Sequence, residues 1–303
     1  MRPTQVIDTK MHDLPGITGT FLLEDEQTAL IETGPKSGVE NVLAGLRRAA
    51  VERLDWIIVT HIHLDHAGAA GTLARHFPEA RVGVHEVGVP HLVEPSKLWS
   101  SAARIYGGAM ERMWGGIDPL PRERIVPLAD GDKIELGERT LQAVNTPGHA
   151  RHHHAFLDVS SGETFAGDAL GVRLPDVGLM RPATPPPEFD LEAAVGSIAR
   201  LKELRPTTVY LTHFGSPAGG ANPAPPEAVC DEAAEALQEW ATWVRDARPQ
   251  TGDLDEATKL VTERSRTTMG RNVGEDAIDR MEQTTSYRMN TWGYMRYFDK
   301  QEQ

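Results

Sequence analysis

The sequence has one cysteine, Cys230, and it has no long hydrophobic run. A single cysteine cannot form an intrachain disulfide and excludes metal sites built from several thiolates, so any metal must use His and carboxylate ligands. No apolar segment approaches the roughly 20 residues that span a bilayer, and the N-terminal residues lack the basic-then-apolar layout of a signal peptide. We therefore expect a cytoplasmic protein without a membrane partner.

Basic residues are also scarce, because the 303 residues include 31 Lys and Arg against 44 Asp and Glu, a net charge of -13. Nucleic-acid binding depends on Lys and Arg displacing counterions, so this charge disfavours a nucleic-acid partner. The contents of 40% hydrophobic and 25% charged residues are ordinary for a globular protein. The length fits one large domain or a larger domain with a smaller appendage.

The N-terminal part alternates predicted strands with predicted helices. Apolar patterns predict strands over residues 18–23 and 28–31 joined by a polar turn, a helix over 39–46, a buried strand over 56–59 and a helix over 67–74. Short apolar runs between residues 125 and 170 predict a second set of antiparallel strands. This order of elements implies layered packing of helices on sheets.

The C-terminal part becomes helical after a turn-rich connector. A helix is predicted over residues 191–201 and a strand over 208–211, followed by Pro and Gly residues over 215–227. Beyond that connector, helical spacing predicts helices over residues 229–244, 254–265 and 276–289. We therefore predict a larger domain over residues 1–222 and a helical extension over 223–303. Because the extension is too small to form an independent hydrophobic core, we expect it to pack on the larger domain.

Four potential metal ligands fall within six positions in the motif His61-x-His63-x-Asp65-His66. The motif follows the predicted strand over 56–59, and α/β sheets usually place their sites at the carboxyl ends of strands. Residues two apart on an extended segment point the same way, so His61 and His63 can bind one ion, while a turn can direct Asp65 and His66 to a second. A single His is usually an ordinary residue, but this density predicts a metal site.

Three later candidates, His149, Asp168 and His213, lie among or after predicted strands and would complete two metal sites. Imidazole and carboxylate ligands suit zinc, and iron or manganese accept the same set. The tract His152-His153-His154 has three interpretations: a weak extra metal site, a substrate contact, or partly buried strand residues. We favour the structural interpretation for at least two of the three.

Four ordered motifs resemble those of the metallo-β-lactamase superfamily: THIHLDHAG at 60–68, TPGH at 146–149, FAGDA at 165–169 and LTHFG at 211–215. The resemblance covers about residues 15–215. It implies an α/β (α+β) fold, the αββα sandwich with a dinuclear metal site at one edge of the sheets. It also implies that the first ion binds His61, His63 and His149, that the second binds Asp65, His66 and His213, and that Asp168 bridges them.

Two finer features accompany this resemblance. Glu32 stands where the superfamily commonly has the Asp of an Asp-x-Gly motif, and its longer side chain puts the usual hydrogen bonds from this position in question. The linkage of TPGHARHHHAF to FAGDALGV and RPATPPPEFD resembles the branch of glyoxalase-II-like hydrolases with a helical C-terminal extension. That branch implies a Pro-rich loop over 172–189 near the site mouth and C-terminal helices that wall the pocket; Tyr287, Trp292 and Tyr294 either line it or pack in the core.

The resemblance predicts a metallo-hydrolase in which a hydroxide bridging two divalent ions attacks a small acyl thioester, ester or lactone. A thiolate leaving group needs little acid help, whereas an alkoxide needs a proton donor, for which Asp65, His153 and a tyrosine are candidates. The alternatives are a phosphodiesterase or phosphotriesterase, a mononuclear iron persulfide dioxygenase, and a non-catalytic ligand-binding module. The superfamily also makes a homodimer plausible.

Overall fold

The computed structural model describes residues 2–175, 177–216, 223–269 and 274–302. It forms two compact units, the first comprising Met1–Asn145 and His154–Phe165 and the second comprising Thr146–His153 and Ala166–Gln303. The domain boundary that the sequence predicts near residue 222 lies among residues 217–222, outside the described residues. The division into 1–222 and 223–303 therefore stays a prediction.

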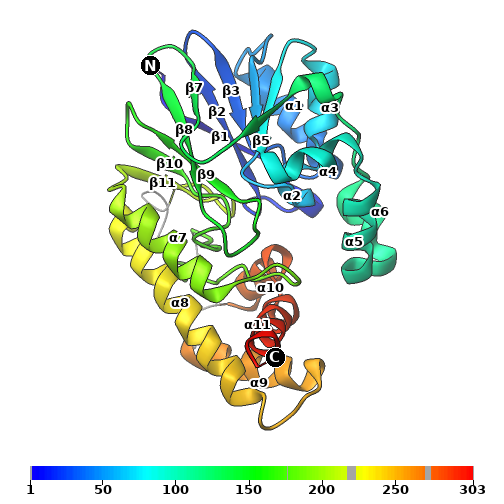
Figure 1. Cartoon of the computed structure of the whole chain (residues 1–303), viewed down its shortest axis with the longest axis vertical. Coiled ribbons are helices and arrows are strands. Elements are labelled where there is room, and N and C mark those ends of the chain that lie inside the picture. The colour runs from blue at the N-terminus through cyan, green and yellow to red at the C-terminus, as the bar shows by residue number, and fades with distance from the viewer. Residues whose placement is uncertain (1, 176, 217–222, 270–273, 303) are drawn as a thin grey trace. The chain divides into compact units, whose positions relative to one another are not determined.

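The first unit contains a mixed six-stranded sheet in the order β1-β2-β3-β4-β5-β6 and four antiparallel strands in the order β10-β9-β8-β7 (Figure 1). In the first sheet β1, β2 and β3 are antiparallel, and β3 to β6 are parallel. The strands are β1 (Gln5–Asp8), β2 (Gly19–Glu24), β3 (Thr28–Ile31), β4 (Trp56–Ile58), β5 (Arg81–His85), β6 (Ile125–Leu128), β7 (Lys133–Glu135), β8 (Thr140–Asn145), β9 (His154–Asp158) and β10 (Glu163–Phe165).

Helices cover one face of the first sheet. Leu22, Leu30, Ile57 and Val82 form one cross-strand row, and this row shares a buried apolar cluster with the predicted apolar face of α1. Strands that are buried on both faces have apolar residues at successive positions, which explains why these strands appear in the sequence as short continuous apolar runs. The helices of this unit are α1 (Val39–Arg48), α2 (Leu64–Ala67), α3 (Ala70–His76), α4 (Val89–Val93), α5 (Ser96–Tyr106) and α6 (Met110–Trp114).

The opposite face of the first sheet packs on the second set of strands. The rings of Phe21 on β2 and Phe165 on β10 lie 5.4 Å apart, and the backbone N–H of His154 donates to the Thr60 carbonyl at 2.8 Å. Side chains of both sheets are therefore buried against each other within the first unit. The predicted sandwich of two sheets with flanking helices is confirmed, as are the predicted hairpin and the strand that precedes the histidine motif.

The second unit contains one described strand, β11 (Thr208–Tyr210), and a helical region. Its helices are α7 (Leu191–Glu203), α8 (Pro226–Ala247), α9 (Leu254–Met269), α10 (Glu275–Thr284) and α11 (Tyr287–Gln301). Helix α7 packs along α8, and α8 and α11 both pack against α9. None of the described helices combines the length and apolar character that a membrane span requires.

Two predicted helices differ from the structure. The single helix predicted over 276–289 is wrong, because Thr285 and Ser286 have extended backbones and separate α10 from α11. The Ser286 hydroxyl accepts a hydrogen bond from the backbone N–H of Met289 at 3.1 Å and so caps the start of α11. The helix predicted over 67–74 is two short helices, α2 and α3, and the first of them begins earlier, at Leu64.

Candidate metal centre

Four of the predicted ligands lie together in the first unit, on the segment that follows β4. The central position of β4 in a parallel stretch of sheet places His61 and His63 at a carboxyl strand end. The chain then turns into α2, whose first turn carries Asp65 and His66. The backbone N–H and hydroxyl of Thr33 both donate to the His66 carbonyl, at 2.8 and 2.7 Å, and fix the end of this segment.

The side chains of this segment converge as the motif predicts. Nε2 of His61 lies 2.9 Å from Nδ1 of His63, close enough for both nitrogens to face one ion. Ligand atoms of His61 and His66 lie within 4.8 Å of each other, and so do those of Asp65 and His66. Nε2 of His66 lies 3.6 Å from a carboxylate oxygen of Asp65. Four ligand-type side chains thus gather in a small volume of the first unit.

Glu32 orients two of these histidines. Its buried carboxylate accepts from Nδ1 of His66 at 2.9 Å and from the Thr60 hydroxyl at 2.6 Å. The single hydroxyl proton of Thr60 is directed to Glu32, so Nδ1 of His61, 3.0 Å away, donates to that hydroxyl. Both rings therefore carry their proton on Nδ1 and present Nε2 as the metal-binding atom. Although Glu32 is longer than the Asp that is common at this position, it hydrogen-bonds directly to the predicted ligand His66 and, through Thr60, to His61.

The other three predicted ligands lie together in the second unit. His149 follows Gly148, whose φ of +130° suits glycine and whose position leaves no room for a Cβ, which would meet Cα of Ala194 at 2.4 Å. The Gly148 carbonyl accepts from the Asp190 backbone N–H at 2.9 Å, which holds this loop against the start of α7. Asp168 lies in the turn that follows residue 165, and His213 lies in a turn after β11.

Asp168 presents one carboxylate oxygen to each of the two histidines. Oδ2 lies 3.5 Å from Nε2 of His149, and Oδ1 lies 3.6 Å from Nε2 of His213. Two ligand atoms that each lie about 2.0–2.1 Å from one tetrahedral ion are about 3.4 Å apart, so these separations suit coordination. This arrangement fits the bridging position that the family resemblance implies for Asp168.

The histidine tract has a different role at each position. Nε2 of His153 accepts from the Asp168 backbone N–H at 3.1 Å, and its Nδ1 lies 2.8 Å from the Thr146 hydroxyl. His152 lies 3.5 Å from the Glu188 carboxylate, and His154 belongs to β9 in the first unit. Because Nε2 of His153 accepts, it carries no proton to donate, and His153 acts as a structural support for Asp168. The sequence could not show this, because it depends on a contact between two loops.

Tyr106 on α5 is a candidate proton donor. The sequence predicts a tyrosine as one candidate for this role but does not indicate which one. Burial, and then the negative charge of Asp65, raise the pKa of Tyr106 well above its ordinary value. Its hydroxyl therefore stays protonated near neutral pH. The sequence feature that could have indicated Tyr106 is the helical spacing of Leu98, Trp99 and Ala102, because these residues pack in the same cluster as Leu64.

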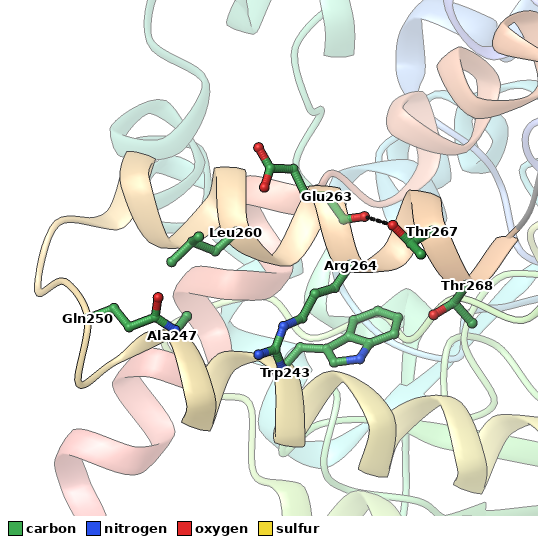
Figure 2. Close-up of a pocket in the computed structure, with 8 residues that line it drawn as sticks. All are labelled: Trp243, Ala247, Gln250, Leu260, Glu263, Arg264, Thr267 and Thr268. Atoms are coloured by element: carbon green, nitrogen blue, oxygen red, sulfur yellow. Dashed lines mark hydrogen bonds between the residues drawn. The ribbon is translucent and has the colours of Figure 1, made fainter.

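The second unit has a small cavity beside two predicted ligands and a larger cavity away from them. A cavity of about 10 Å³, room for about one water molecule, is lined by His149 and Asp168 and by apolar side chains from the loop before α7, from α7 itself and from α8. A larger cavity of about 440 Å³ lies between α8 and α9 (Figure 2) and touches none of the predicted ligands. The lining residues of this cavity are Trp243, Ala247, Gln250, Leu260, Glu263, Arg264, Thr267 and Thr268.

The aromatic residues expected near the pocket belong mainly to the core of the second unit. Tyr287 stacks on Trp240 with ring centroids 5.5 Å apart, and the buried hydroxyl of Tyr294 donates to the Leu237 carbonyl at 2.8 Å. Trp292 is half-buried. Core packing is therefore the better interpretation for Tyr287 and Tyr294.

A family model described as the metallo-β-lactamase superfamily matches residues 15–213, a span that includes all seven predicted ligands. The chain belongs to this superfamily. It is 29% identical over 208 residues to the metallo-β-lactamase fold-containing protein ST1585 of Sulfurisphaera tokodaii, covering 67% of this chain and 75% of that protein. The crystal structure of ST1585 from Sulfolobus tokodaii matches with a TM-score of 0.72 at 23% identity, covering 97% of this chain and 99% of that one, which shows the fold.

Two further relatives concern the activity. A probable metallo-hydrolase of Burkholderia pseudomallei, BURPS1710b_2304, is 30% identical over 226 residues, covering 67% of this chain and 71% of the relative. A hydroxyacylglutathione hydrolase of Gloeothece citriformis is 29% identical over 168 residues, covering 53% of this chain and 54% of the relative, so it is a distant glyoxalase II homologue. With the clusters of His and Asp, the family makes this chain a metallo-hydrolase. The distribution of seven ligands over two ions stays a prediction.

Proposed function

We propose that this chain is a dinuclear hydrolase of a small acyl thioester, ester or lactone. The supporting observation is that each unit holds a cluster of His and Asp side chains in which a hydrogen bond to Nδ1 of a histidine leaves its Nε2 available for a metal. Glu32 fixes His66, and the Ala183 carbonyl, 2.9 Å from Nδ1 of His149, fixes that ring. In this proposal both units supply ligands, distributed as the family motifs imply. The distant hydroxyacylglutathione hydrolases support an acyl thioester as the first substrate class to test.

The donor set suits the proposed ions. Imidazole nitrogens and carboxylate oxygens without thiolates fit zinc, and they also accept iron or manganese. When bound, two such ions lower the pKa of water and polarise the substrate oxygen, which allows hydrolysis without a protein nucleophile. The contribution of this chain is to hold the ligand rings in one tautomer and to surround them with apolar side chains.

Proton transfer to the leaving group is assigned to the Tyr106 hydroxyl beside Asp65. The raised pKa of Tyr106 means that its hydroxyl is protonated near neutral pH. An alkoxide is a stronger base than a tyrosinate, so this hydroxyl can protonate an alkoxide as the acyl bond breaks. A thiolate is stable in water near neutral pH and does not need this proton. Esters and lactones are therefore expected to depend on Tyr106 more than thioesters do.

The proposal is tested by elemental analysis of protein purified without added metal, together with turnover of thioester, lactone and phosphodiester substrates before and after chelation. We expect about two metal equivalents per chain and one chelator-sensitive acyl hydrolysis. His76→Ala serves as the control, because His76 is exposed and lies outside the predicted ligand set, so this change should alter neither quantity.

Other outcomes would replace the proposal with a defined alternative. Chelator-sensitive turnover of the phosphodiester alone would make the chain a phosphodiesterase. A single iron with oxygen consumption would indicate the persulfide dioxygenase reaction. Two bound ions without turnover of any substrate would support a ligand-binding module.

A further inference from the structure

Asn290 on α11 holds the loop segment 182–184 through hydrogen bonds to both of its ends. Its Nδ2 donates to the Pro182 carbonyl at 2.7 Å, and its Oδ1 accepts from the Thr184 backbone N–H at 3.0 Å and from the Thr184 hydroxyl at 3.1 Å. Asn290 is fully buried. A buried amide that satisfies both its donor and its acceptor fixes the position of the backbone that it contacts.

Ala183, the residue between these two contacts, supports a predicted metal ligand. Its carbonyl lies 2.9 Å from Nδ1 of His149. A carbonyl can only accept, so Nδ1 of His149 carries the proton and Nε2 is the atom that faces the Asp168 carboxylate, 3.5 Å away. The direction of the Ala183 carbonyl thus determines both the tautomer and the orientation of the ring.

The approach of α11 to this loop is unusually close and depends on a second residue. A Cβ at Gly293 would lie 1.8 Å from the Thr184 carbonyl oxygen, so no other residue fits there without moving the helix or the loop. The loop is also fixed from α10, because the buried Arg181 guanidinium contacts Glu282 at 2.6 Å and the Thr285 carbonyl at 3.0 Å. The C-terminal helices therefore hold this segment at independent points.

We propose that Asn290 is a positioning residue for His149, so that α11 forms part of the support of the metal centre. This inference rests on the proposed function, because it assumes that His149 binds an ion. In this proposal the C-terminal extension orients a predicted metal ligand, in addition to packing against the rest of the second unit. The expected consequence is selective, because Asn290 acts on the ligand of one ion and not on the ligands of both.

The test compares three variants of the full chain. Asn290→Leu removes all the hydrogen bonds of the amide at similar size, and Asn290→Asp keeps the acceptor for Thr184 but loses the donor to Pro182. Thr291→Val is the matched control, because Thr291 is equally buried on the same helix and its hydroxyl has no hydrogen-bond partner among the described residues. Circular dichroism identifies folded variants, and Asn290→Asp decides the question if Asn290→Leu does not fold.

Two readouts separate positioning from general stability. Calorimetric zinc titration should show affinity for one ion lowered by about 10- to 100-fold in Asn290→Asp, with the other ion bound as in the wild type. Nitrogen-15 shifts of the His149 ring in metal-free protein should show a mixture of tautomers in place of one. Thr291→Val should match the wild type in both measurements.

Three results would overturn the inference. The first is wild-type zinc binding and a single His149 tautomer in Asn290→Asp, and the second is an equal loss for both ions. The third is a Thr291→Val variant that changes as much as Asn290→Asp. A wild-type chain that binds no metal at all would instead refute the proposed function, because that result concerns the ligands themselves.

Discussion

The two ligand clusters are held by different kinds of support. In the first unit the buried carboxylate of Glu32 accepts from His66 directly and from His61 through the Thr60 hydroxyl. In the second unit the support for His149 is a backbone carbonyl, that of Ala183, and the support for Asp168 is its own backbone N–H, which donates to His153. One cluster thus depends on a charged side chain and the other on the path of the backbone.

This difference has an energetic consequence. A carboxylate that accepts from an imidazole raises the basicity of the ligand through its charge, and a substitution at that one residue removes the effect. A carbonyl provides the same tautomer without a net charge, and no side-chain substitution removes it. Its position depends on residues elsewhere, here Asn290 and Gly293 on α11. We therefore expect local sensitivity in the first cluster and distributed sensitivity in the second.

The strongest test of the comparison exchanges one ligand in each cluster. The Asp168 carboxylate lies 3.5 Å from His149 and 3.6 Å from His213, whereas the Asp65 carboxylate lies 3.6 Å from His66. We expect Asp168→Ala to lose measurable hydrolysis and both ions, and Asp65→Ala to retain one ion. Elemental analysis after dialysis against a weak chelator measures how many ions each variant retains. If Asp168→Ala keeps two ions, Asp168 does not bridge.

A second prediction concerns the protonated neighbour of the first cluster. Tyr106→Phe removes the hydroxyl whose pKa is raised by burial and by Asp65. Turnover of an alkyl ester should fall by about 100-fold, since general acid catalysis typically contributes 10²–10⁴-fold. Turnover of the matching thioester should stay close to the wild-type rate. Because the proton stays on Tyr106 through the neutral range, the wild-type ester rate should show no alkaline decline from this group up to about pH 9. Equal losses for ester and thioester would contradict the assignment.

How much the sequence predicts follows from the same contrast. The motif from His61 to His66 is local, so its spacing alone predicts the convergence that the structure has in the first unit. The gathering of His149, Asp168 and His213 could only be predicted from their matching positions in family motifs, because the three lie far apart in sequence. The supports of the second cluster could not be predicted, since Asn290 contacts Pro182 and Thr184 only after the C-terminal helices have packed.

The fold shows a similar division between local and distant signals. The hairpin of β2 and β3 and the buried β4 follow from short apolar patterns. The break between α10 and α11 is set by Ser286, whose capping hydrogen bond to Met289 has a local signature that apolar spacing alone does not reveal. The Thr285 hydroxyl donates to Oδ1 of Asn290 at 2.8 Å and also lies 3.3 Å from the distant Pro182 carbonyl, a contact that no local pattern predicts.

A third prediction tests the charged support of the first cluster. Glu32→Gln keeps the size of the side chain but removes the negative charge shared by His66 and Thr60. Zinc affinity should fall by about 10- to 100-fold, since supports of this kind typically contribute that much. Glu32→Asp is the informative partner, because it keeps the charge and shortens the reach by one methylene. If both variants bind zinc as the wild type does, the carboxylate does not support the ligands.

The smallest expected effect is at His153, where the contact is a single hydrogen bond to the backbone of Asp168. His153→Gln places an amide oxygen where Nε2 accepts the Asp168 N–H, whereas His153→Met has similar volume and no strong acceptor. We expect His153→Met to lower zinc affinity by about tenfold and His153→Gln to restore most of it. The absorption spectrum of the cobalt-substituted protein should change in the same order, because it reports the geometry around the ion. Since a purely steric role would rank the two variants by size and not by acceptor, equal behaviour of Gln and Met would show that packing, and not this hydrogen bond, holds Asp168 in place.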